Sequence, residues 1–241
     1  MTAFTLAVAE TRLILRNRTV LVTAAILPLL LGLSLSQSPI GAASESAGSL
    51  AAVQLAMLLM FGLFMTITMT LAARRQQLYL KRLRTSPAST ASIVAGLASP
   101  LALIVLAQAA IVLAFTAVES GTAPAHPALL VLPFANGAVT MVAFGFLTAS
   151  FTKSPEAAQI TVLPGMVLFM AGVFFALVPA DGAFTLWRKA IPGAALTELT
   201  AIAWDGGQDL TAIAAPLALS TAVALLAAIA AAKLFRWQPR S

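Results

Sequence analysis

The sequence predicts an all-α integral membrane protein, and three observations support this. Of its 241 residues, 60% are apolar and only 9% are charged, whereas about 25% of the residues of a soluble domain are charged. Long apolar runs follow one another, with short polar stretches between them. Most of these runs reach the roughly 20 residues that a helix needs to cross a bilayer. The bilayer is therefore the solvent for most of the chain.

The N-terminal residues 1–18 predict an amphipathic helix at the membrane interface. Apolar residues, among them Phe4, Leu6 and Leu13, alternate with Glu10, Arg12 and Arg16, and this alternation predicts an apolar side and a basic side if the segment is helical. A cleaved signal peptide is the less favoured alternative, because this segment is too long and too apolar for a charged n-region.

Six apolar runs then predict six membrane-spanning helices in a single transmembrane domain, residues 1–241. The runs cover residues 20–36, 50–73, 92–118, 128–151, 157–178 and 210–235. Pro28 predicts a kink in the first run that does not prevent insertion. The longer runs suffice for a hydrocarbon core of about 30 Å.

Basic residues are distributed unevenly between the loops, and this predicts the orientation. Twelve of the 14 Lys and Arg residues fall on one side of the six spans, and only Arg188 and Lys189 fall on the other. The twelve are Arg12, Arg16, Arg18, Arg74, Arg75, Lys81, Arg82, Arg84, Lys153, Lys233, Arg236 and Arg240. Because basic residues accumulate in short cytoplasmic loops, both termini are predicted to be cytoplasmic, in a bacterial inner membrane. This explains the net charge of +6 without nucleic acid.

No catalytic or nucleotide-binding signature occurs in the sequence. It contains no G-x-x-x-x-G-K-[ST], H-E-x-x-H or G-x-S-x-G motif, no cysteine, and a single histidine, His126. Because metal ligands occur in clusters, His126 is interpreted as an ordinary residue of an outer loop. No carboxylate or lysine lies in the middle of a span, which disfavours a proton- or sodium-coupled carrier. We therefore expect neither an enzyme nor a metal or cofactor site in this chain.

The most informative polar stretch lies between the second and third predicted spans, in residues 74–90. Residues 74–87 read R-R-Q-Q-L-Y-L-K-R-L-R-T-S-P, a short basic amphipathic segment. If it is helical, Leu80 and Leu83 share a face while the basic residues point toward water or lipid headgroups. Ser86-Pro87 would end it. From the charges alone, the simplest interpretation is a solvated loop that only orients the helices.

Leu80 to Pro87 resembles a pattern of the permease family of type-2 ATP-binding-cassette exporters, the daunorubicin-resistance and polysaccharide-export group. The family pattern is similar to E-x-x-G-T-L-K-R-L-R-T-T-P, and this sequence lacks its glutamate and glycine upstream. A second match runs from Leu163-Pro164 through Gly172 to Phe175 and resumes at Trp187 to Pro192. It resembles the family's fifth span and the outer segment that follows.

The resemblance implies a fold with short re-entrant outer helices between the fifth and sixth spans, in residues 179–207. It implies a permease that pairs with a second permease, as a homodimer or heterodimer, in membrane lipid. A cytoplasmic ATP-binding-cassette ATPase would hold ATP and Mg and would dock on residues 74–90. The residues implied in this coupling are Gln77, Tyr79, Leu80, Lys81, Arg82, Leu83, Arg84, Thr85 and Pro87.

The function implied is ATP-driven export of a hydrophobic or amphipathic substrate, such as a drug, antibiotic, lipid or glycan. The alternative from another class is an uncoupled membrane scaffold or passive channel. Soft and polar side chains within the spans are candidates for lining a pathway, although amides in spans more commonly bond between helices. The candidates are Gln54, Met57, Phe61, Met65, Asn136, Gln159, Phe174 and Phe175. Trp187 and Trp204 are interpreted as anchors at the membrane interface.

Single cysteines test the predicted orientation directly, because the natural chain has none. We expect a cysteine in place of Ser46 or Thr122 to react with a membrane-impermeant thiol reagent added to intact cells. A cysteine in place of Ser89 should react only after the membrane is permeabilised. Labelling at position 89 from outside, with protection at position 46, would reverse the orientation.

Overall fold

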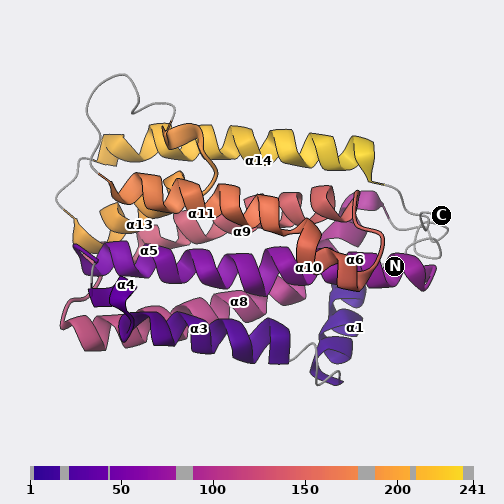
Figure 1. Ribbon diagram of the computed structural model, residues 1–241, viewed down its shortest axis with the longest axis horizontal. Helices are drawn as coiled ribbons and strands as arrows, with labels where there is room; N and C mark the ends of the chain where they lie inside the picture. Colours follow the sequence, from indigo (N-terminus) through magenta and orange to yellow (C-terminus); the bar gives the residue numbers. More distant parts are fainter. Residues whose placement is uncertain are drawn as a thin grey trace.

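The computed structural model describes residues 3–16, 22–42, 44–79, 89–178, 188–206 and 210–235. These residues form helices and connecting loops, and no β-strand occurs among them. The long helices run side by side along one axis, with both termini near the same end of the bundle (Figure 1). The predicted all-α fold is confirmed for this part of the chain.

Five helical runs in the described residues are long and apolar enough to cross a bilayer. They are Ala47–Gln76, Thr90–Ser120, Pro127–Ala149, Pro155–Leu177 and Thr211–Leu234. Each begins and ends within three residues of a predicted span. Hydrophobic length is a property of the local sequence, and this explains the agreement.

Several of these runs combine two or three helical segments. The first consists of α5 (Ala47–Met57), the π-helix η2 (Leu58–Met65) and α6 (Thr66–Gln76). The others are α8 (Thr90–Ser120), η3 (Pro127–Leu130) with α9 (Val131–Ala149), α10 (Pro155–Thr161) with α11 (Leu163–Leu177), and η4 (Leu210–Ile213) with α14 (Ala214–Leu234). We call the α5–η2–α6 run the central helix.

The first predicted span is represented by a shorter helical run. The π-helix η1 (Val22–Ile26) continues directly into α3 (Leu27–Ser36), and a four-residue helix, α4 (Pro39–Ala42), follows. Pro28 lies in the first turn of α3. At 1.5 Å per residue, η1 and α3 together are about 22 Å long, less than the roughly 30 Å of a hydrocarbon core. The first predicted span, and with it the count of six spans, therefore stays a prediction.

The N-terminal helix α1 (Ala3–Arg16) lies across the bundle rather than along it (Figure 1). It packs on the start of α8, so closely that a Cβ atom on Gly96 would lie 2.7 Å from the Leu6 side chain. Exposed apolar residues remain on α1 outside this contact, among them Phe4 and Leu13. This is the geometry expected of a helix at the membrane interface.

One part of the α1 prediction is wrong. The sequence pattern predicts Glu10 on the charged side of the helix with Arg12 and Arg16, whereas Glu10 is only 2% exposed and faces the bundle. Leu6 and Glu10 are four residues apart and therefore share the face of α1 that packs on the bundle, where Glu10 forms an ion pair with Arg74 of α6.

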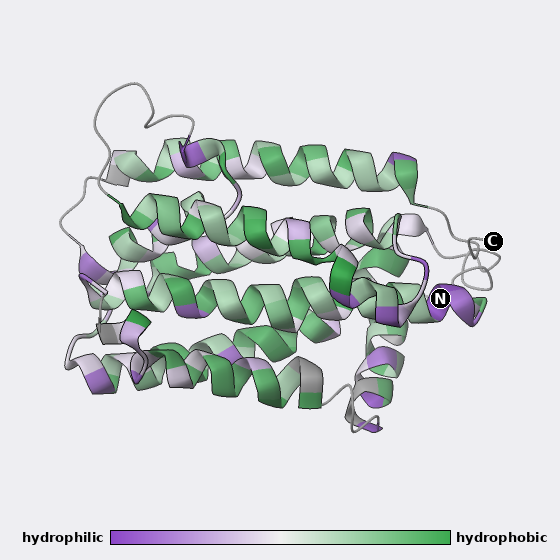
Figure 2. Cartoon of the chain, in the orientation of Figure 1, coloured by the Kyte–Doolittle hydropathy of each residue, from purple (hydrophilic) through white to green (hydrophobic). Residues whose placement is uncertain are grey.

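Strongly hydrophilic residues are concentrated near the two ends of the bundle, and the region between is mainly apolar (Figure 2). One end, which we call the basic end, carries Arg12, Arg16, Arg74, Arg75, Lys153 and Lys233. The other, the acidic end, carries Glu45, Glu119, Glu198 and Asp205. Lys189 also lies at the acidic end and forms an ion pair of 3.3 Å with Glu198. The described charged residues that the loop distribution assigned to one side of the membrane therefore lie at one end of the bundle, and those assigned to the other side lie at the other end.

The helix α13 (Ala194–Asp205) occupies the segment between the last two spans, where the resemblance implies re-entrant helices. It is mostly buried and packs against α5, α9 and α11 at the acidic end. Asp205 fixes it to the start of α5, because its carboxylate accepts hydrogen bonds from Gly48 N at 3.1 Å and from Ser46 Oγ at 2.7 Å. A carboxylate at a helix N-terminus satisfies free N–H groups and the helix dipole.

The interpretation of Trp204 as a membrane-interface anchor is wrong. Its side chain is 2% exposed, and Nε1 donates a hydrogen bond to Thr122 Oγ1 at 3.3 Å. The loop after α8 covers it, since Ala125 N and His126 N donate to the carbonyls of Trp204 and Ala203 at 2.9 and 2.8 Å. Trp187, interpreted in the same way, lies outside the described residues.

Candidate functional site

The central helix contacts most of the other helices and buries a larger share of its length than any other membrane-spanning run in the described residues. Its middle is η2, an eight-residue π-helix. π-helices are rare, are usually limited to one turn, and occur frequently at functional sites. At the basic end the central helix leads directly into the predicted coupling segment. It therefore connects the middle of the bundle with the proposed docking surface.

Three of the predicted lining residues form one half-buried stripe on the central helix. Met57, Phe61 and Met65 recur at intervals of four residues, close to one helical turn. The side chains between them are mostly buried, including those of Leu59 and Phe64. The stripe lies on a helix flanked by α3 and α11. We call it the methionine stripe.

The two predicted amides in the bundle make hydrogen bonds between helices. Gln54 is fully buried, and its Nε2 donates to Gly32 O at 3.1 Å and to Ser36 Oγ at 3.2 Å. Its Oε1 accepts a hydrogen bond from Thr116 Oγ1 at 2.7 Å. One side chain thus joins α3, α5 and α8. Asn136 similarly joins α9 to α14, because its Nδ2 donates to Thr221 Oγ1 at 3.0 Å.

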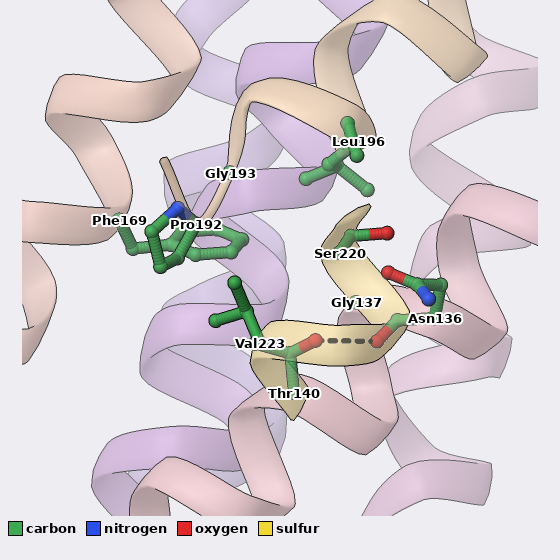
Figure 3. Close-up of a pocket in the computed structure, with 10 residues that line it drawn as sticks. Asn136, Gly137, Thr140, Phe169, Pro192, Gly193, Leu196, Ser220 and Val223 are labelled. Atoms are coloured by element: carbon green, nitrogen blue, oxygen red, sulfur yellow. Dashed lines mark hydrogen bonds between the residues drawn. The ribbon is translucent and has the colours of Figure 1, made fainter. Parts of the chain in front are cut away.

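Asn136 also borders a small cavity between α9, α11, α13 and α14. Figure 3 shows Thr140, Phe169, Leu196 and Ser220 around the same space. Its volume is about 10 Å³, enough for about one water molecule. The remaining predicted lining residues, Gln159, Phe174 and Phe175, are exposed on α10 and α11.

Two consecutive arginines end the central helix at the basic end, and each binds a different neighbour. Arg74 forms an ion pair with Glu10 of α1 through both of its terminal nitrogens. Its guanidinium carbon also lies 4.9 Å from the centre of the Tyr79 ring, within cation–π range. Arg74 therefore ties the central helix to the N-terminal helix.

Arg75 is 1% exposed and ties the central helix to the end of α9. It donates hydrogen bonds to Ala149 O at 3.0 Å and to Thr152 O. The last carbonyls of a helix have no partner within the helix, and a cation there also complements the negative end of the helix dipole. A buried guanidinium thus closes the C-terminus of α9.

Burial alters the acidities of the groups around Arg74. Burial raises the pKa of Glu10 above its ordinary value, and the positive charge of Arg74 partly offsets this effect. Burial also raises the pKa of Tyr79, with a further contribution from the Glu10 carboxylate. Because the pKa of Glu10 is higher in the folded chain, its contribution to stability is present below its ordinary pKa and is lost as the pH rises through the raised value.

The structure describes two of the predicted coupling residues. Gln77 is exposed, and Tyr79 is half-buried beside Arg74. The others lie outside the described residues: Leu80, Lys81, Arg82, Leu83, Arg84, Thr85 and Pro87. Sequence reasoning missed Glu10 as a site residue, and it placed Arg74 and Arg75 in the coupling segment 74–90 without naming them among the coupling residues. The sequence did contain one indication that Glu10 has a basic partner, because Glu10 is one of only two acidic residues on the basic side. Nothing in the sequence shows that Arg75 is buried.

The central helix ends with Leu78 in the left-handed backbone region, at a φ of 57°. Leu78 N donates to Arg75 O at 3.1 Å. This conformation favours glycine and costs other residues about 1–2 kcal/mol. When the family pattern quoted above is aligned with residues 75–87, its glycine falls on Leu78 and its glutamate on Arg75. These two departures from the pattern are therefore a leucine in a glycine-type conformation and the buried arginine of this site.

These features define a class of protein, a multi-pass membrane protein whose central helix leads into a basic segment at one end of the bundle. The sequence profile of a family described as ABC-2 family transporter protein matches residues 18–233. The chain therefore belongs to the ABC-2 transporter family, as the resemblance implied, and it is a membrane-spanning permease of an ABC transporter. Membership implies an ATP-binding-cassette ATPase as partner. No curated protein matched the chain.

Substitution of Arg75 tests its structural role. We expect Arg75→Gln to lower the free energy of unfolding by about 1–3 kcal/mol, because two carbonyls at the buried end of α9 lose their charged donor. The control Arg16→Gln removes the same charge from an exposed position of α1 and should change stability by less than about 0.5 kcal/mol. Unfolding of both variants in detergent gives the comparison. Equal stabilities would show that Arg75 contributes no more than a surface charge.

Proposed function

We propose that this permease is half of an exporter that moves a hydrophobic or amphipathic substrate out of the cytoplasm. The substrate class includes drugs, antibiotics, lipids and glycans, so that the physiological role is efflux and drug resistance or secretion. ATP and Mg are bound by a separate cytoplasmic ATPase. The observation that supports this most strongly is the arginine pair, which links the predicted coupling segment to two different parts of the bundle.

Movement of the coupling segment would reach the bundle along two routes. The first passes from Arg74 through Glu10 to α1, which packs on α8. The second passes from Arg75 to the end of α9 and the turn that follows it. There Thr152 Oγ1 and Thr161 Oγ1 are hydrogen-bonded at 2.7 Å, which connects the turn to α10 and so to α11. Closure of the ATPases would then shift α1, α9 and α11 together with the central helix.

The substrate pathway is placed between two permease copies, along the methionine stripe. Methionine and phenylalanine side chains adapt to apolar ligands of varied shape. On the neighbouring helix α11, Phe174 and Phe175 are exposed close to the acidic end. The second copy is this same chain in a homodimer or a related permease in a heterodimer.

In this proposal the basic end faces the cytoplasm, so that both termini lie on the cytoplasmic side of a bacterial inner membrane. The acidic end and α13 then face outward. The alternative, an uncoupled scaffold or passive channel, requires neither the motif from Leu80 to Pro87 nor the connection of that segment to α1 and α9.

The coupling proposal is tested by removing apolar contacts while keeping every positive charge. In the Leu80→Ser/Leu83→Ser variant, we expect substrate-stimulated ATP hydrolysis and export to fall by about tenfold or more, because burial of two leucine side chains contributes more than the roughly 1.4 kcal/mol of a tenfold change. Membrane insertion should be unchanged, since the basic residues remain. A companion variant, Lys81→Gln/Arg82→Gln, should weaken docking while Arg74, Arg75 and Arg84 hold the loop inside.

Both variants are measured in vesicles that contain the permease and its ATPase, with insertion and subunit stoichiometry checked in parallel. Normal stimulation and transport in the Leu80/Leu83 variant would show that this stretch is only a solvated loop.

The position of the pathway is tested by cross-linking between copies. We expect a single cysteine in place of Phe61 to form a covalent dimer in membranes, and bound substrate to slow this reaction. The control is a cysteine in place of Val139, which is exposed on α9 and should remain monomeric. Dimers through position 139 and none through position 61 would place the interface between copies on another face.

A further inference from the structure

An apolar groove lies on a face formed by α8, α9 and α14, none of which carries the methionine stripe. Its volume is about 1010 Å³, and its lining comes from residues 90–102, 138–146 and 228–235. Nine of its 16 lining residues are alanine, and none is charged. α14 packs closely along α9, whereas α8 makes only sparse contacts with α9. The short side chains and the sparse contact leave open space between α8 and α14.

The length of the groove matches one leaflet of a bilayer. Its lining extends for about 11 to 18 Å along the three helices, at a rise of 1.5 Å per residue. One leaflet contributes about half of a hydrocarbon core of roughly 30 Å. A partner membrane helix would instead need a contact surface along the whole core. Beyond the groove, however, the exposed residues of α8 are large, among them Leu103, Leu106 and Ile111.

The groove lies in the half of the bundle next to the basic end. Lys233 is exposed in the last turn of α14, beside the lining residue Ala232, and Arg236 and Arg240 follow in the sequence. The first residues of α8, Thr90 and Ala91, line the same end of the groove, where the helix dipole is positive. Phe146 and Phe235 also line it, with ring centroids 5.5 Å apart. The apolar groove thus opens beside positive charge.

We propose that this groove binds an anionic phospholipid of the leaflet at the basic end. Its acyl chains lie between α8 and α14, against the small side chains of α9. Its phosphate lies beside Lys233. The binding site is separate from the methionine stripe, and it depends on neither the transported substrate nor the ATPase.

The test is native mass spectrometry of the purified full chain in mild detergent, titrated with phosphatidylglycerol or phosphatidylcholine of identical acyl chains. We expect one phosphatidylglycerol to be retained per chain, and retained more tightly than phosphatidylcholine. Ala95→Phe and Ala228→Phe, at exposed positions that line the groove, should each weaken its binding by tenfold or more. Lys233→Gln should reduce the preference for the anionic lipid about fivefold, the equivalent of one basic residue near the membrane surface.

The controls are Ala110→Phe and Ala222→Phe, which place the same side chain at exposed positions of α8 and α14 outside the groove. These variants should bind phosphatidylglycerol like the natural chain. Unfolding temperatures measured without lipid identify any variant that fails to fold. If a phenylalanine variant fails to fold, the lipid preference of Lys233→Gln still tests the proposal. Equal binding by the groove and control variants, or equal binding of the two lipids by the natural chain, would overturn the proposal.

Discussion

The buried guanidinium of Arg75 holds the basic end of the bundle together. It belongs to the central helix and donates hydrogen bonds to the carbonyls of Ala149 and Thr152, at the end of α9. The contact favours both partners, because an unpaired carbonyl or an unpaired buried charge costs several kcal/mol in apolar surroundings. Each group therefore satisfies the other. The turn into α10 begins directly after these carbonyls, so this contact also sets where α10 and α11 lie relative to the central helix.

Similar polar contacts hold the central helix along the rest of its length. Gln54 joins three helices toward the acidic end. In the π-helical middle, Thr66 Oγ1 donates to Phe61 O at 3.0 Å and so satisfies a carbonyl of the widened turns. Thr68 Oγ1 donates to Phe64 O at 2.9 Å. Thr68 Oγ1 also lies 3.4 Å from Gly145 O of α9, a contact between helices. Because apolar packing alone does not favour protein over lipid, the bonds between helices and close packing specify which helices associate.

The size of the exposed side chains distinguishes two faces of the bundle. The methionine stripe presents long, adaptable side chains on a helix that is otherwise buried, a surface suited to a second protein copy and to varied substrates. The groove between α8 and α14 is lined mainly by alanine and leaves a space that flexible hydrocarbon chains can fill. Both faces are apolar, but they differ in the size and flexibility of the side chains that they present. The arginine pair lies at the end of the central helix, from which the basic segment continues.

The sequence by itself determined the membrane class, the positions of five long helices, the segregation of charge and the family motif. These are properties of local hydrophobic length, loop composition and short patterns, and they survive in any arrangement of the helices. Only the tertiary structure decided that Glu10 and Arg75 are buried, that Trp204 lies in the protein interior, and that small residues of three helices border one groove. The physical reason is that hydropathy measures the free energy of moving a side chain from water into apolar surroundings, whether lipid or protein. Lipid and protein interior are almost equally apolar, so only contacts between distant helices decide which face meets which.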